Sequence, residues 1–172
     1  MDRFAHTDAA YLIADSILGE LTFVRQALEA AGCERIYISG DEAEALALIE
    51  HERIDLVLVA WDAFHDGLEL LHALRRTPEH RQLPVCFILE AAVDPERVAR
   101  LQETGDRLLG YGVKPLSPGA LLHAIGELFD TLSNLVAALS GTKAHGRSCP
   151  RSWRCIPPVA RSPHSYAKSC NT

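Results

Sequence analysis

Several short apolar runs in this 172-residue chain are followed by side chains that could bind a ligand or an ion. Asp15 and Ser16 follow the first such run, Glu90 follows a later one, and Lys114 follows the last. In the run DLVLVAW, the corresponding position before the loop is Ala60. Carboxylates can hold a cation, and a carboxylate can form an ion pair with a lysine ammonium. A methyl group can do neither. The pattern therefore predicts polar side chains after several apolar runs and a non-reactive methyl group at the corresponding position of DLVLVAW.

The elements that position these residues alternate between short apolar strands and amphipathic helices. Strands are predicted at 11–14, 35–39, 55–61, 84–89 and 108–113, and a helical pattern follows each of them. Short strand–helix connections imply a parallel sheet with helices on both faces. The predicted class is α/β, a doubly wound five-stranded parallel sheet with an extended C-terminal helix, and its ligands would gather beyond the carboxyl ends of the strands.

The chain changes character near residue 140. All 23 acidic residues lie at or before Asp130 together with 11 of the 17 basic residues, which gives this part a formal charge of −12. Six basic residues and no acid follow Thr131. We therefore expect a domain at 1–140, which includes the extended fifth helix, and a basic tail at 141–172 that is disordered or non-native.

The composition argues against several classes of protein. No apolar run approaches the roughly 18–20 residues of a membrane helix, and the acidic start MDRFAHTD is unlike a secretory signal, so the expected location is the cytoplasm. An acidic body repels phosphate, so nucleic acid would be bound only weakly by the tail or by a missing output domain. The sequence shows no nucleophile–base pair, and no enzymatic activity is expected. The histidines considered for such a pair are scattered: His65, His72, His80 and His123.

From about Ala10 to about Leu132, the order of elements resembles the receiver domain of two-component response regulators. The matching pieces are YLIADS, DLVLVAW with DGLELLHALR behind it, LPV, and GYGVKPLSPGAL, which carries an aromatic residue and a Lys-Pro pair. The resemblance implies a flavodoxin-like fold. It also implies a switch in which an aspartate after the third strand is phosphorylated and binds Mg²⁺ together with acids after the first strand.

Carried over residue by residue, the resemblance predicts a degenerate pocket. Asp15 matches the first acid, but Ser16 stands at the second and Ala60 at the phosphoacceptor position. Glu90 stands at the family's hydroxyl position, where it would pair with Lys114, which matches the family's lysine. Alanine cannot form an acyl phosphate. One remaining carboxylate holds Mg²⁺ poorly, so no cofactor is expected and Mg²⁺ binding should be weak or absent.

Three residues keep alternative interpretations. Asp62 lies two residues beyond Ala60, and a two-residue shift keeps the same face of a strand, so Asp62 is either a displaced phosphoacceptor or a solvated loop carboxylate. Asp15 either belongs to the pocket or caps the first helix. Tyr111 is either a switch aromatic, as the resemblance implies, or a half-buried strand residue.

The fifth helix is longer than the sheet requires. Leu121, Ile125 and Leu128 would cover the sheet, and Leu132, Leu135 and Leu139 continue the same apolar stripe past the expected end of the domain. The predicted contact seam runs from Leu128 to Leu139. An exposed leucine seam usually packs against another helix. The seam therefore predicts a homodimer or a protein partner at the fifth helix, and the alternative is a helix that folds back on its own domain.

The cysteines divide in the same way as the charges. Cys33 and Cys86 are interpreted as small core residues, whereas Cys149, Cys155 and Cys170 lie in the tail at spacings that match no zinc ligand pair. The tail either binds an acidic partner or nucleic acid non-specifically, or is non-native sequence from a shifted reading frame.

The favoured function is a receiver-like signalling module that needs no phosphate and acts through protein contact or dimerisation. One alternative is a phospho-receiver that uses Asp62. Another is a module that binds a small ligand in the pocket around Ala60.

Overall fold

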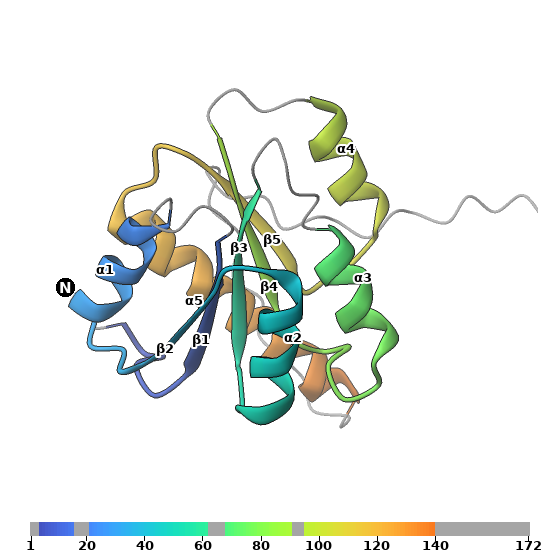
Figure 1. The fold of residues 1–172 in the computed structure, drawn as a ribbon, viewed down its shortest axis with the longest axis horizontal. Helices are drawn as coiled ribbons and strands as arrows, with labels where there is room; N and C mark the ends of the chain where they lie inside the picture. Colours follow the sequence, from blue (N-terminus) through green and yellow to red (C-terminus); the bar gives the residue numbers. More distant parts are fainter. Residues whose placement is uncertain (1–3, 16–20, 62–67, 91–94, 140–172) are drawn as a thin grey trace, which may run out of the picture.

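The computed structural model contains a five-stranded parallel sheet flanked by helices (Figure 1). The structure describes residues 4–15, 21–61, 68–90 and 95–139, without the side chain of Arg97. The strands are β1 (Ala10–Ala14), β2 (Arg35–Ser39), β3 (Leu56–Trp61), β4 (Val85–Leu89) and β5 (Leu109–Val113). The helices are α1 (Thr22–Ala30), α2 (Glu42–His51), α3 (Leu68–Arg76), α4 (Pro95–Glu103) and α5 (Pro118–Leu139).

The sheet has the order β2-β1-β3-β4-β5, and every neighbouring pair is parallel. Figure 1 shows α1 and α5 on one side of the sheet and α2, α3 and α4 on the other. This is the doubly wound, flavodoxin-like arrangement, so the predicted fold class is confirmed. The carboxyl ends of all five strands lie at one end of the sheet, and we call this end the carboxyl edge. The opposite end, where all five strands begin, is called the amino edge.

Two apolar cores lie on the two faces of the sheet. β3 and β4 are buried along their whole length because helices cover both of their faces. One core joins the sheet to α1 and α5, and the other joins it to α2, α3 and α4. β2 is an edge strand, and accordingly Arg35 is exposed and Ile38 is 40% exposed.

Local sequence signals set the ends of the helices. Asp41 caps α2 by accepting a hydrogen bond from the backbone N–H of Glu44 at 2.8 Å, and the Glu44 carboxylate accepts from the N–H of Gly40 at 2.8 Å. Gly32 follows α1 with φ of +95°, a conformation that favours glycine. The Ser117 hydroxyl accepts from the N–H of Ala120 at 3.1 Å and starts α5.

The extended α5 is present and reaches Leu139 as predicted. It packs closely on β5, because a Cβ added to Gly110 would lie 3.2 Å from a methyl carbon of Leu128. Leu128 is 2% exposed and belongs to the core. Leu128 therefore covers the sheet, as predicted for the first half of the helix, and β5 leaves it no exposed surface to offer to the predicted seam. Among the described residues, no helix is long and apolar enough to cross a membrane.

Candidate functional site

Asp15 lies directly after β1 at the carboxyl edge and is 4% exposed. Its backbone N–H donates to the Ser39 carbonyl at 3.0 Å, which extends the pairing of β1 with β2. Its carboxylate accepts a hydrogen bond from the N–H of Leu21 at 2.8 Å, just before α1. The carboxylate therefore ties the strand to the start of the first helix, as in the capping interpretation. Ser16 lies outside the described residues.

Ala60 occupies the penultimate position of β3 and is 5% exposed. It pairs with Ile88 of β4 and belongs to the core that contains α1 and α5. Its neighbour Trp61 still belongs to the strand and faces the other core, where its ring lies 5.1 Å from that of Phe87. The end of the strand is thus filled by apolar side chains on both faces. Asp62 lies outside the described residues.

Glu90 and Lys114 meet at the ends of β4 and β5. The Lys114 ammonium donates to the Glu90 carboxylate at 2.6 Å, and the Lys114 backbone N–H donates to the Leu89 carbonyl at 2.8 Å. The Lys114 side chain is 19% exposed and that of Glu90 is 55% exposed. An ion pair this open to solvent contributes only about 0.2–1 kcal/mol. Its importance therefore lies in where it holds the amine.

Tyr111 points into the sheet's second core and is 8% exposed. It pairs in register with Phe87 of the neighbouring strand. This inward position matches the interpretation as a strand aromatic, and a switching role stays a prediction.

The predicted pocket residues therefore lie at one edge, but they are not equivalent. Glu90 and Lys114 are in direct contact, whereas Asp15 belongs to the strand on the other side of β3. Of the described residues that match the metal-holding positions of receivers, only Asp15 carries a carboxylate. One carboxylate with an oxygen committed to a backbone N–H is a poor match for Mg²⁺, which needs several hard oxygen ligands.

The end of α5 is only partly covered by the domain. Leu132 and Leu135 are half-buried, Val136 is 48% exposed and Leu139 is 78% exposed. The seam that the leucines predict thus begins at Leu132. The seam is less exposed than the sequence suggests, because Leu132 and Val136 already line a pocket at the amino edge of the sheet.

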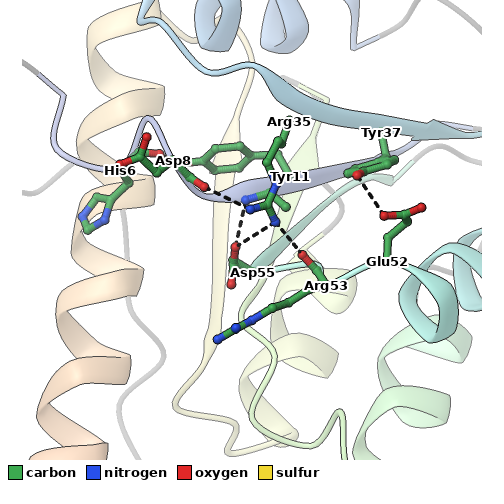
Figure 2. Close-up of polar contacts among 9 residues, drawn as sticks. His6, Asp8, Tyr11, Arg35, Tyr37, Glu52, Arg53 and Asp55 are labelled. Carbon is green, nitrogen blue, oxygen red and sulfur yellow. Dashed lines mark hydrogen bonds and ion pairs between the residues drawn. The ribbon is translucent and has the colours of Figure 1, made fainter.

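The sequence did not predict a polar network at the amino edge (Figure 2). The Arg35 guanidinium donates to the carbonyls of Asp8 and Arg53 at 3.5 and 3.1 Å, and lies 3.9 Å from the Asp55 carboxylate. Asp55 also accepts from the N–H of Ala10 at 2.9 Å. Arg35 thereby joins the N-terminal segment, β2 and the α2–β3 loop. The only sequence signal was a basic residue at the start of an edge strand.

The buried groups with perturbed acidity also lie away from the carboxyl edge. Burial raises the pKa of the Tyr11 hydroxyl, which donates to the His6 carbonyl at 2.8 Å. Burial likewise raises the pKa of the Cys33 thiol, which keeps it protonated and unreactive at neutral pH. Cys33 and Cys86 are both buried, in agreement with their prediction as core residues.

Known proteins resemble the chain in both sequence and fold. No protein-family model matches it. Over 112 residues it is 35% identical to "Cyclic di-GMP phosphodiesterase response regulator RpfG" of Xanthomonas campestris pv. campestris (strain 8004). This match covers 64% of the chain but 29% of that relative, so the chain spans less than a third of the curated relative's length.

Solved receivers share the fold over most of their length. A CheY-like response regulator receiver domain protein from Methanospirillum hungatei JF-1 is 25% identical with a TM-score of 0.61, and the match covers 74% of this chain and 98% of that one. For the chemotaxis response regulator CheY4 of Vibrio cholerae, the identity is 23%, the TM-score 0.58, and the coverage 70% and 98%. The similar segment of the Xanthomonas protein and these shared folds therefore make the chain similar to CheY-like receiver domains of response regulators.

Proposed function

We propose that this receiver domain signals without phosphorylation and acts through contact with other proteins. The observation that carries the proposal is the methyl side chain of Ala60 at the end of β3, buried in the core. A phosphorylated receiver needs a carboxylate there, because the phosphoryl group is carried as an acyl phosphate. No rotamer of alanine can supply one.

The ion pair between Glu90 and Lys114 supports the same proposal. In a working receiver, the lysine amine would contact a phosphoryl oxygen that arrives and leaves. Here the amine lies 2.6 Å from a carboxylate that belongs to the chain itself. A carboxylate of the chain thus takes the place beside the lysine, so we propose that the carboxyl edge needs no phosphoryl group.

Incubation of the full chain with acetyl phosphate and Mg²⁺, followed by intact-mass measurement, tests the proposal. The expected result is no gain of a phosphoryl group. The alternative function, a phospho-receiver with Asp62 as displaced acceptor, requires a gain that disappears in Asp62→Asn and persists in the matched variant Asp66→Asn. Such a gain would overturn the proposal. The other alternative, a small ligand in the pocket, would appear as a ligand-dependent rise in melting temperature.

We propose the end of α5 as the contact surface, with Leu132, Leu135 and Leu139 as its apolar residues. Their partial exposure supports a protein partner or a second copy of the chain. The name of the Xanthomonas relative suggests that a receiver of this kind controls cyclic di-GMP turnover. The match covers 29% of that relative, and we propose for this part of the chain a controlling role.

A further inference from the structure

A pocket of about 400 Å³ lies at the amino edge of the sheet, opposite the edge where receivers carry their chemistry. Three segments that are distant in sequence form it: the end of α2 with the α2–β3 loop, the α3–β4 loop, and the last turns of α5. In Figure 1 the end of α5 passes close to these loops below the sheet. Its volume falls within the range of about 300–1,000 Å³ that is typical of binding sites.

The inner lining of this pocket is apolar. Ile49 and Leu83 are buried there together with Pro84, and Leu132 and Val136 of α5 form one wall. Val136 is an aliphatic residue with 48% of its surface exposed. Covering such a wall removes apolar surface from water, which favours a complex.

The rim of the pocket is predominantly acidic. Glu52, Asp55 and Glu79 line it together with Arg53 and His80, and the Arg35 guanidinium lies 3.9 Å from the Asp55 carboxylate. Glu52 accepts from the Tyr37 hydroxyl at 3.0 Å (Figure 2). Glu79 forms no hydrogen bond or ion pair within the part of the chain that the structure describes. Its negative charge is therefore available to a partner.

The charge of the whole domain distinguishes between possible occupants. Residues up to Asp130 carry 23 acids and 11 bases, so a second copy would bring the same excess of negative charge to this rim and be repelled. A segment with an aliphatic face and basic flanks satisfies both the apolar lining and the acidic rim.

We propose that the pocket at the amino edge docks a basic amphipathic helix of a protein partner. An aliphatic side chain of that helix packs between Leu83 and the wall of Leu132 and Val136, while a lysine or arginine one turn away pairs with Glu79. This inference rests on the proposed function, a receiver that acts by protein contact, and it adds the site and the chemistry of the partner.

The test uses the full chain and a fluorescein-labelled helical peptide of about 18 residues, with leucine on one face and lysine on the other. A second peptide carries glutamate at every lysine position. Fluorescence anisotropy should show binding of the lysine peptide and at least about tenfold weaker binding of the glutamate peptide, a difference of about 1.4 kcal/mol. Binding of the lysine peptide should weaken as salt is raised.

Variants test whether the lysine peptide binds in the pocket. Glu79→Lys and Val136→Asp should each weaken the lysine peptide by at least about fivefold, whereas two matched controls should not. Glu103→Lys reverses an exposed carboxylate on α4, and Ile38→Asp changes an exposed aliphatic side chain on β2. Circular dichroism of each variant confirms that it is folded. Equal binding of both peptides, or unchanged affinity in both pocket variants, overturns the inference.

Two other occupants give distinct results. A dimeric mass in light scattering that Val136→Asp returns to a monomer would assign the pocket to a second copy. Tighter peptide binding in the chain that lacks residues 142–172 would assign it to the chain's own basic tail. Either result overturns the assignment to a partner. Phosphoryl transfer to the chain would instead refute the proposed function and leave the peptide result standing, so the two failures are distinguishable.

Discussion

The contact between α5 and β5 makes a sharp prediction about Gly110 and Leu128. Replacing Gly110 by alanine would place a Cβ 3.2 Å from one methyl carbon of the buried Leu128 and 3.3 Å from the other. Overpacking of this kind costs roughly 1–3 kcal/mol, while removal of a flexible strand glycine returns about 0.5–1 kcal/mol. We expect Gly110→Ala to lower the free energy of unfolding by about 1 kcal/mol.

The sign should reverse when Leu128 is shortened. Leu128→Ala alone should cost about 2–5 kcal/mol, because it opens a cavity in the core. In that background the new methyl group of Gly110→Ala meets no crowding, so it should stabilise the domain by about 0.5–1 kcal/mol. The coupling energy of the double-mutant cycle is then about 1.5–2 kcal/mol.

Urea unfolding of the four proteins, followed by circular dichroism at 222 nm, measures the cycle. Gly126→Ala is the matched control, since a Cβ at that glycine of α5 meets nothing within 4 Å and the change should stabilise the helix by about 1 kcal/mol. Additive effects at Gly110 and Leu128 would refute the packing of α5 on β5, and would return Leu128 to the exposed seam.

Three further predictions concern the cap of α1, the acidity of a tyrosine, and the tail. Asp15→Ala should lower the free energy of unfolding by about 1–2 kcal/mol in urea, because it leaves the N–H of Leu21 without its acceptor; Asp15→Asn should recover most of the loss. The hydrogen bond to Glu52 raises the pKa of the Tyr37 hydroxyl, so Glu52→Gln should lower that pKa in an absorbance titration at 295 nm. Because the folded state holds this proton more tightly, the associated stability is present below the ordinary tyrosine pKa near 10 and is lost as pH rises above it. Removal of residues 142–172 should leave the melting temperature nearly unchanged in calorimetry, and a large fall would show that the tail packs on the domain.

The fold was readable from the sequence because most strands are short, fully buried apolar runs separated by strong helix signals. β2 was predicted at its observed bounds, and α5 was predicted to reach Leu139. Asp41 caps α2 by a local hydrogen bond with Glu44, so nearby residues alone determine that end of α2.

The remaining features depend on contacts between distant segments, which periodicity does not report. Leu128 and Leu132 occupy the same stripe of α5, but only β5 determines that the first is buried and the second half-exposed. The pocket at the amino edge is similarly hidden, because Glu79 and Val136 are brought together by a helix that continues beneath the sheet. The pairing of Glu90 with Lys114 was foreseeable, since both follow strands that are adjacent in a doubly wound sheet.

The direction of α5 determines which part of the helix the domain holds. The helix starts just after Lys114 at one pole of the sheet and ends beyond the other, and its 22 residues form a rod about 33 Å long. Its buried residues, Leu121, Ala124, Ile125 and Leu128, all lie in its first half, so the domain holds one half of the rod and leaves the last turns partly open to solvent. A substitution in the last turns should therefore alter what binds beyond the sheet, while the packed half of the helix keeps its place.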